Sequence, residues 1–442
     1  MYLPISDVGE TAPAALAEAI RPWSPAKRVG FRFGFAYLLL YCLPGSGTSS
    51  IFAGLPWIED WLESVAAKPW IALWHWVAVH IFHLSGAVTM PHPTGSGDTT
   101  LSYIQTFCNL VIAVVAALVW TALDRRRTQY QTLYAWLRLV VRFSLAFTLL
   151  GYGFAKVFPL QFRPPGLYAL TETYGESSPM GLLWNFMGAS KAYTIFSGST
   201  EVLAGLLLLF RWTTLLGALV AMGVTLNIVL LNFCYDVPVK LFSTHLLAMA
   251  IFLTIPYWPA LWCFFILHKP AQPHGVWVPP FTRRWLRVAA IVLQVLVIVS
   301  VLTSNLWGGY TDYREAYQDQ PSSLMGVWTV TQFSADPQGT PIVPWRRLVI
   351  SQGSATRLVD QTGDTAKVTS AVDMAEHSIQ IGGARWGHSA KFSFQQLDPQ
   401  HMVLTGKLDD RPVTMTLQKQ GERTFLLTTR GFHWISEDPF NR

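Results

Sequence analysis

Long apolar segments fill most of the chain up to about residue 306, and a different pattern begins near residue 325. Seven segments are long enough to cross a hydrocarbon layer of roughly 30 Å as helices that rise about 1.5 Å per residue. They lie near 29–44, 101–123, 136–157, 192–210, 213–233, 241–267 and 285–306. We therefore predict a membrane-embedded all-α helical bundle with about seven transmembrane helices.

A further apolar stretch, 69–84, would make an eighth helix if it crossed the membrane. That crossing would move Arg125, Arg126 and Arg127 to the side opposite the other basic residues. The stretch belongs to a tryptophan-rich region, 57–84, and indole rings favour the headgroup level of a bilayer. We therefore expect 57–84 to form an interfacial or re-entrant helix on the outer face.

From Met325 the apolar residues alternate with polar ones, which is typical of antiparallel strands. The runs are GVWTVTQF, RRLVIS, KVTSAVDM, SIQIGG, KFSFQQL, HMVLTGK, VTMTLQK and TFLLTT. About eight short strands predict a small closed barrel or a sandwich, after a linker over 307–321. Gly326-Val327-Trp328 resembles the G-x-W of lipocalin-like barrels, and Arg430 resembles the basic residue that packs on that tryptophan.

The composition supports a bilayer environment, because 51% of the residues are apolar and only 13% are charged. The basic residues that flank the apolar segments fall on one side, which the positive-inside rule identifies as the cytoplasm. They are Lys27, Arg28, Arg32, Arg125, Arg126, Arg127, Arg138, Arg211, Lys269, Arg283, Arg284 and Arg287. This arrangement places the N-terminus inside and the β domain outside, and it explains the basic pI without a nucleic-acid partner.

Five segments follow from these patterns. We expect a cytoplasmic segment over 1–28 and N-terminal transmembrane helices with the tryptophan-rich segment over 29–135. A four-helix unit follows over 136–267, then the last transmembrane helix and linker over 268–319, and an outer β domain over 320–442. The first 22 residues contain Asp7, Glu10 and Glu18 and no basic stretch before an apolar run, so we expect insertion through the first helix.

Ionisable residues lie at membrane depth in the four-helix unit. Glu201 falls about 12 Å below the outer end of its segment, where an acid costs about 2.5–3.5 kcal/mol and needs a partner. Lys156 is the best-placed cation for pairing with Glu201 or Asp236. We predict that Glu201, Lys156, His245 and Asp236 line one pocket open to the outer side. Glu201, His245 and Lys156 are the candidate catalytic groups, and the candidate ligand-binding residues are Asp236, Lys240, Asn227 and Asn232. The alternative is that these groups only cap helix ends and hold helices together.

The region 136–267 resembles the DoxX-like family of bacterial membrane proteins. The resemblance rests on GYGFAKVF, the SSPMGLLW loop, the apolar helix around Glu201 and YDVPVKLFSTHLL. It implies a four-helix unit in the bacterial inner membrane that faces a quinone or is linked to redox chemistry, because some members are subunits of a thiosulfate:quinone oxidoreductase. This chain adds an N-terminal helix, the tryptophan-rich segment and the β domain.

Other polar groups suggest less. His80 and His83 share a helix face, but no carboxylate or cysteine completes a metal-binding spacing, so no metal is expected. In the loop 92–100, Ser96, Asp98 or Thr99 is suited to cap the next helix.

Two classes of function remain. One is a quinone-linked oxidoreductase, or a subunit of one, with a quinone or another amphiphile as cofactor or ligand. The other is a non-enzymatic membrane protein whose outer β domain binds a ligand or a protein partner.

Overall fold

The computed structural model describes most of the chain as two compact units. The described residues are 22–45, 56–85, 95–270, 283–318, 324–336, 342–351, 355–383, 386–421 and 425–439. The first unit, here the helical unit, comprises Met1–Gln161 and Thr194–Tyr313, and the second, the barrel unit, comprises Phe162–Tyr193 and Arg314–Arg442. Of the expected N-terminal segment 1–28, residues 1–21 lie outside the described residues.

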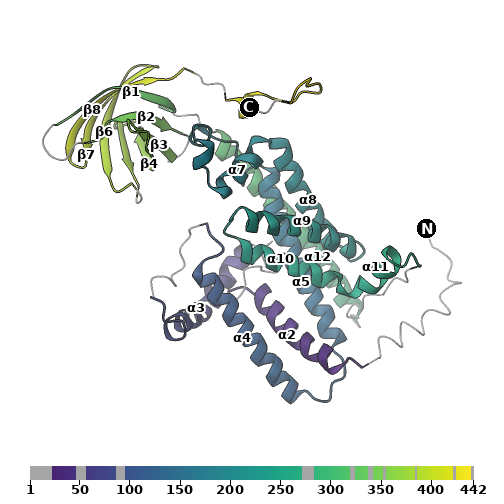
Figure 1. Ribbon diagram of the computed structural model, residues 1–442. Coiled ribbons are helices and arrows are strands. Elements are labelled where there is room, and N and C mark those ends of the chain that lie inside the picture. The colour runs from purple at the N-terminus through teal and green to yellow at the C-terminus, as the bar shows by residue number, and fades with distance from the viewer. Residues whose placement is uncertain are drawn as a thin grey trace. The chain divides into compact units, whose positions relative to one another are not determined.

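The helical unit is built from long apolar helices (Figure 1). They are α2 (Pro25–Cys42), α3 (Pro56–His80), α4 (Thr100–Leu123), α5 (Gln131–Val157), α8 (Lys191–Leu209), α9 (Thr214–Cys234), α10 (Lys240–Thr254) continued by η4 (Ile255–Tyr257) and α11 (Trp258–Phe265), and α12 (Arg284–Gln318). Six spans among the described residues are long and apolar enough to cross a membrane: α4, α5, α8, α9, α10 with α11, and α12. A multi-pass membrane protein is thereby supported. The seventh predicted span corresponds to α2, whose 18 residues include three basic ones, and it stays a prediction.

The basic end of α2 lies against the connection between α4 and α5. The backbone N–H of Trp23 donates to the carbonyl of Thr128 at 3.0 Å. Arg32, only 3% exposed, donates to the Tyr130 hydroxyl at 2.6 Å and to the Asp124 carbonyl at 2.7 Å. Arg32 was expected only as a flanking charge. It is instead buried and links α2 to α4 and α5, because its guanidinium donates to residues at the end of α4 and at the start of α5.

The tryptophan-rich region forms one helix, α3, which packs on α4. Trp74, Val77 and Ala78 are buried against Ile104 and Cys108 of α4. The expected helix over 57–84 is therefore present, with Pro69 inside it. Its position relative to a bilayer stays a prediction.

Helices α5 and α8 approach each other closely through glycines. A Cβ atom added at Gly198 would lie 2.6 Å from the Gly153 carbonyl oxygen, and one at Gly205 would lie 2.8 Å from Cγ of Leu150. In lipid, the hydrophobic effect does not drive helices together, so close packing has to hold them. Small residues allow this packing because they let helix backbones approach closely. We call Gly153, Gly198 and Gly205 the glycine seam.

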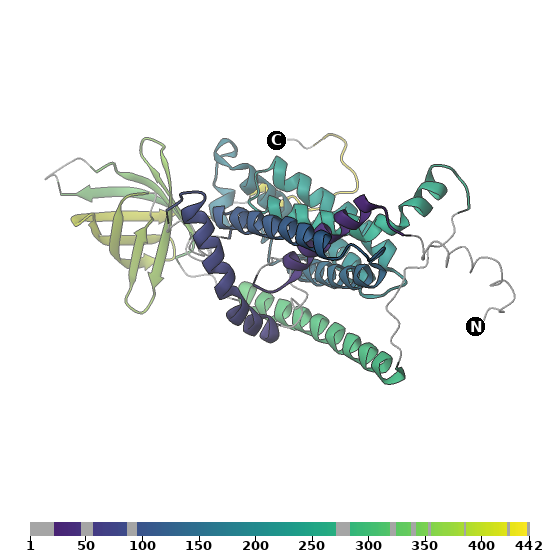
Figure 2. The same cartoon turned by 90° about the horizontal axis from the view of Figure 1, so that it is seen from below.

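The linker predicted over 307–321 is wrong for its first twelve residues. Helix α12 continues without a break to Gln318, as Figure 2 shows. The sequence signal that suggested a linker was Gly308-Gly309, but Gly309 serves packing: a Cβ there would lie 2.4 Å from Cδ2 of Phe158. A glycine inside a helix can mark a close contact as well as a chain break.

The barrel unit contains a closed barrel of eight antiparallel strands. The strands are β1 (Gly326–Ala335), β2 (Trp345–Ile350), β3 (Ala355–Asp360), β4 (Thr365–Asp373), β5 (Ser378–Gly382), β6 (Ser389–Asp398), β7 (His401–Leu408) and β8 (Arg411–Lys419). Each strand pairs with the next one along the chain, and β1 pairs with β8 to close the sheet. Of the two expected architectures, the structure has the barrel.

Two strand assignments differ from the expectation. The run TFLLTT was expected as a strand, but Leu426–Thr429 form the short helix α13. The strand β3, Ala355–Asp360, was missed. Closure explains the first difference, because β8 already pairs with β1 and leaves no edge for a ninth strand.

The barrel interior is filled with apolar side chains. Trp328 is fully buried, and its Nε1 donates to the Leu324 carbonyl at 2.7 Å. The Lys419 ammonium lies 5.5 Å from the centre of the Trp328 ring, the kind of contact that the lipocalin resemblance implied for Arg430. Eight strands enclose a space just wide enough for side chains. Trp328, Phe392 and Met402 fill it.

The barrel unit also includes the connection between α5 and α8. It carries α6 (Leu167–Leu170), η3 (Tyr174–Glu176) and α7 (Pro179–Ala189).

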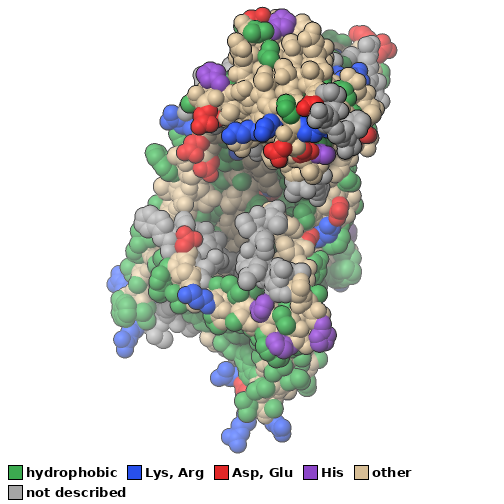
Figure 3. Space-filling view, turned by 90° about the vertical axis from the view of Figure 1, so that its left-hand side faces the viewer, with side chains coloured by type: hydrophobic (Ala, Val, Ile, Leu, Met, Phe, Trp, Pro, Cys, Tyr) green, Lys and Arg blue, Asp and Glu red, His purple; other side chains and the backbone are tan. Residues whose placement is uncertain are grey.

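Figure 3 shows hydrophobic side chains gathered over the helical elements, whereas the barrel presents charged side chains of both signs.

Candidate functional site in the helical unit

Lys156 and Glu201 form a buried ion pair between α5 and α8. The Lys156 Nζ lies 2.9 Å from both carboxylate oxygens and donates a hydrogen bond to Oε2. The two side chains are 7% and 1% exposed. The predicted pairing of Lys156 with Glu201 is therefore confirmed. Among the described residues, Oε1 accepts no hydrogen bond of acceptable geometry, so this oxygen retains capacity for a proton or a ligand hydroxyl.

The glycine seam explains why the pair sits where it does. Gly198 lies one turn before Glu201, and a Cβ there would lie 2.6 Å from Cβ of Lys156. The absence of a side chain at Gly198 lets α5 approach α8 closely enough for the lysine to reach the carboxylate. Lys156 also lies over the ring of Tyr152, with 5.7 Å between Nζ and the ring centre.

His245 of α10 faces α2, away from the ion pair. Its ring lies parallel to the Tyr41 ring, with 4.3 Å between centroids. One ring nitrogen, Nδ1, is 2.7 Å from the Leu241 carbonyl and must donate to it, so the other, Nε2, accepts from the Tyr37 hydroxyl at 2.6 Å. In the neutral ring, these two contacts select the tautomer that carries its proton on Nδ1.

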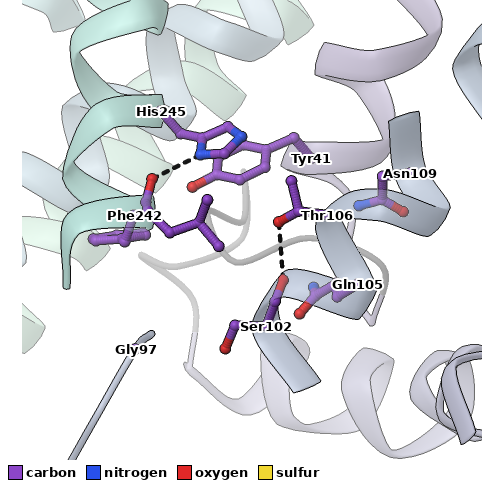
Figure 4. A pocket seen from close by; sticks show the side chains of 9 residues that line it. Tyr41, Gly97, Ser102, Gln105, Thr106, Asn109, Phe242 and His245 are labelled. Carbon is purple, nitrogen blue, oxygen red and sulfur yellow. Dashed lines mark hydrogen bonds between the residues drawn. The ribbon is translucent and has the colours of Figure 1, made fainter. Parts of the chain in front are cut away.

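A small cavity lies beside His245. It has a volume of about 20 Å³, and its polar lining comes from His245 and from Ser102, Gln105, Thr106 and Asn109 of α4. Figure 4 shows the stacked Tyr41 and His245 rings, with Thr106 beside them and Ser102, Gln105 and Asn109 on the same helix. This volume is enough for about one water molecule. A quinone ring would need the surrounding side chains to move.

Lys240 and Asp236 form a second, exposed ion pair at the start of α10. The Lys240 Nζ lies 2.7 Å from Asp236, whose side chain is 84% exposed. Exposed pairs of this kind contribute about 0–1 kcal/mol. The Lys240 ammonium also lies 3.9 Å from the better-buried carboxylate of Asp98.

The two asparagines lie on different faces of α9. Asn232 is buried and donates to the Ser243 hydroxyl at 3.0 Å, which links α9 to α10. Asn227 is exposed on the surface of the unit. The structure therefore gives Asn232 a role in holding helices together.

The predicted convergence of four residues on one pocket is not what the described residues show. Of Glu201, Lys156, Asp236 and His245, only His245 lines the cavity. The physical reason is the direction of each helix face: Glu201 points from α8 to α5, whereas His245 points from α10 to α2. One aromatic path runs between them, since Tyr152 beside Lys156 contacts Phe242 of the cavity with 5.8 Å between ring centroids.

Comparison with known proteins gives one informative match. No protein-family model matches the chain, and no solved structure matches it. The Uncharacterized protein YwoB of Bacillus subtilis strain 168 is 39% identical over 114 residues, which cover 25% of this chain and 71% of that protein. The chain belongs to the YwoB family. That name assigns no activity, and the DoxX-like resemblance stays a proposal.

Sequence reasoning on this YwoB-family chain missed several residues near the site. Tyr37 and Tyr41 contact His245 from a helix that is more than 200 positions away in the chain. Of the three candidates for the cap of α4, Ser96, Asp98 and Thr99, the structure has Thr99, whose hydroxyl accepts from the Ser102 N–H. Asp98 instead caps α10, because its carboxylate accepts from the N–H groups of Lys240 and Leu241, each at 2.9 Å. The sequence signal was a carboxylate, Asp98, in a glycine-rich loop. That signal indicates a helix cap, but it does not tell which helix is capped.

Proposed function

We propose that this chain is a multi-pass protein of the bacterial inner membrane that binds a quinone or a similar amphiphilic carbonyl compound and exchanges protons with it. The site is the outer half of the helical unit, with Glu201 and Lys156 as the proton-handling pair. The supporting observation is that this pair lies, 1% and 7% exposed, between two helices that are apolar enough to span a membrane.

The cost of burial favours a functional role for the pair. Charged residues inside a membrane span are rare and usually mark a ligand or proton pathway. A lysine–carboxylate pair can transfer a proton internally, donate to a carbonyl oxygen and accept from a hydroxyl. The hydrogen-bonding capacity that remains on Oε1 of Glu201 offers one place for such a group.

His245 and Tyr37 are the second proton-handling element of the proposal. The Tyr37 hydroxyl donates to His245, and the ring stacks on Tyr41 beside a cavity with polar walls. A quinone head group is flat, so stacking on aromatic rings suits it. The cavity would have to widen on binding, because its volume of about 20 Å³ is enough for only about one water molecule.

A second candidate is a membrane-anchored binding protein that acts through its barrel. The packed interior favours a partner on the outer surface over a ligand inside, since Trp328 and Phe392 are at most 1% exposed. The partner would then be a protein on the outer side. The two candidates differ in whether the helical unit binds an amphiphile.

The first candidate is tested with the purified full-length chain. Lipid extraction followed by chromatography detects co-purified quinone, and quenching of tryptophan fluorescence by decylubiquinone gives an affinity. We expect bound quinone in the wild type. We expect the Glu201→Gln variant to bind decylubiquinone at least about tenfold more weakly, because a charge-assisted hydrogen bond is worth about 1.5–3 kcal/mol.

The control is Lys68→Met, which removes an exposed lysine of α3 and should leave binding unchanged. Thermal unfolding must show that the Glu201→Gln protein is folded. A wild type with neither co-purified quinone nor affinity for decylubiquinone would reject this function. A folded Glu201→Gln protein with wild-type affinity would remove the ion pair from the site.

A further inference from the structure

Two basic residues lie directly opposite each other on the outer face of the barrel. Arg357 of β3 and Lys367 of β4 are register partners. Their neighbours Leu358 and Val368 belong to the barrel core, and side chains alternate across a strand, so both basic residues point outward. Like charges directly opposite each other destabilise a strand pair. Acidic partners at this position offset that repulsion.

The acidic partners come from the connection between α5 and α8. Glu172 lies 2.9 Å from a terminal nitrogen of Arg357 and 3.7 Å from Nζ of Lys367. Glu176 lies 3.3 Å from Arg357 and also accepts from the Thr365 hydroxyl at 3.3 Å. Two carboxylates thus match the two cations.

An aromatic ring completes the contact. The Arg357 guanidinium lies 4.6 Å from the centre of the Tyr168 ring, and the Lys367 ammonium lies 5.6 Å from it. Arg357 retains only 3% of its side-chain exposure, and Glu172 only 7%. A planar guanidinium suits this combination of stacking and carboxylate pairing better than an ammonium does. We call Arg357, Lys367, Tyr168, Glu172 and Glu176 the docking contact.

Burial makes the docking contact selective. A surface ion pair contributes little, but removing one partner of a buried pair leaves an uncompensated charge and is strongly destabilising. The barrel face around Arg357 therefore fits a segment that brings two carboxylates and a ring. The connection between α5 and α8 supplies both within nine residues, from Tyr168 to Glu176.

The same connection is joined covalently to both halves of the buried ion pair. Helix α5 ends at Val157, one residue after Lys156, and α8, which begins at Lys191, carries Glu201. The connection is therefore the covalent link between the barrel contact and the two helices whose contact buries the pair.

We propose that the barrel docks on the acidic connection between α5 and α8 through Arg357 and Lys367, and that this docking keeps the Lys156–Glu201 pair closed. Through this closure, the docking contact limits the access of a quinone to the pair. The effect on quinone binding rests on the proposed function, whereas the docking and the closure of the pair do not.

The experiment uses the full-length chain in detergent and two readouts that need no quinone. Docking is measured by cleavage with a glutamate-specific protease after Glu172, which is buried in the docking contact. Closure of the pair is measured by the rate at which dicyclohexylcarbodiimide, a reagent for carboxyl groups in apolar surroundings, modifies Glu201, followed by mass spectrometry. Arg357→Gln should raise both rates about tenfold, because cleavage and modification follow the population of the open form.

Two further variants make the test specific. Arg346→Gln removes an exposed arginine of the adjacent strand β2 and should change neither rate. Glu172→Gln removes the buried carboxylate of the same contact, so it should raise the rate of Glu201 modification as Arg357→Gln does.

The outcomes separate the claims. Faster cleavage after Glu172 with unchanged modification of Glu201 would overturn the control of the ion pair. Unchanged rates for both readouts in Arg357→Gln would overturn the docking itself. Absence of decylubiquinone binding in the wild type would reject the proposed function and would not affect either rate.

Discussion

The Lys156 Nζ lies 2.9 Å from the Glu201 carboxylate where α5 and α8 approach each other closely, beside Gly198. The pair and the seam depend on each other. The seam brings the two backbones together, and the pair neutralises the charges that this contact buries. A functional role for the pair and a structural one therefore predict different responses to mutation.

The first prediction concerns stability. Glu201→Leu leaves Lys156 as an unpaired buried charge and should lower the free energy of unfolding by about 3–5 kcal/mol. The double variant Lys156→Met with Glu201→Leu should recover most of that loss, because an apolar pair of similar volume replaces the buried ions. Thermal unfolding in detergent measures both. A double variant as unstable as the single one would show that the pair is not the source of the effect.

The second prediction tests the glycine seam. Gly198→Ala would place a methyl group 2.6 Å from the Gly153 carbonyl oxygen, and overpacking of this kind costs about 1–3 kcal/mol. Gly223→Ala on α9 is the matched control, because nothing lies within 4 Å of its added Cβ. We expect a lower melting temperature for Gly198→Ala and an unchanged or higher one for Gly223→Ala. Equal melting temperatures would contradict the close approach of α5 and α8.

Periodicity predicted the elements better than it predicted the contacts between them. The apolar segments gave helix bounds close to those of α4, α5, α8 and α9, since burial in lipid imposes long apolar runs. The alternating runs gave most of the barrel strands. The pattern failed at β3, where Arg357 occupies an outward position that is buried by the docking contact, and at Gly309, where packing on Phe158 resembled a chain break.

The candidate site shows the same division. Depth along a helix showed that Glu201 needs a partner and offered Lys156 as a cation for Glu201 or Asp236, and the structure pairs Lys156 with Glu201. The depth of a residue along its helix does not tell in which direction its side chain points. His245 was therefore assigned to the same pocket, although it faces Tyr37 and Tyr41. Helix rotation is set by tertiary packing, here by the glycine seam and by the aromatic contacts of α2.

The third prediction concerns the barrel core. Trp328 is fully buried and bonded to the Leu324 carbonyl, so Trp328→Ala should destabilise the barrel by about 3–5 kcal/mol. We expect the fragment 320–442 to fold alone as a β protein. Circular dichroism and urea unfolding of the fragment measure both. A random-coil spectrum would reject independent folding, and an unchanged urea midpoint for Trp328→Ala would reject the role of the ring.

The fourth prediction concerns the pH dependence of the same fragment. A hydrogen bond from His401 holds the pKa of Asp398 below its usual value, and the backbone N–H of Ser389, with His388, does the same for Asp409. A lowered folded-state pKa contributes stability that is present above the unfolded value of about 3.9. That contribution is lost as the pH falls through the folded value. The urea midpoint should therefore drop below about pH 4, and it should drop less steeply in Asp398→Asn.

The last prediction concerns which parts of the chain share one side of the membrane. The connection between α5 and α8 contacts the barrel through Arg357 and Glu172, so both must lie in the same compartment. The α4–α5 connection carries Arg125, Arg126 and Arg127, and the positive-inside rule places it in the cytoplasm. Helix α5 separates the two connections, and it is apolar enough to span a membrane.

Single cysteines report this arrangement in a chain whose native cysteines have been replaced by serine or alanine. Tyr174→Cys in the α5–α8 connection and Gln395→Cys on the barrel lie at exposed positions and should react with an impermeant maleimide added to intact cells. Thr128→Cys, in the α4–α5 connection, should react only after the membrane is permeabilised, and it leaves every arginine in place. Labelling of Tyr174→Cys and Gln395→Cys from opposite sides would contradict the docking contact. Labelling of Thr128→Cys in intact cells would instead reverse the orientation of the whole chain and leave the docking contact untouched.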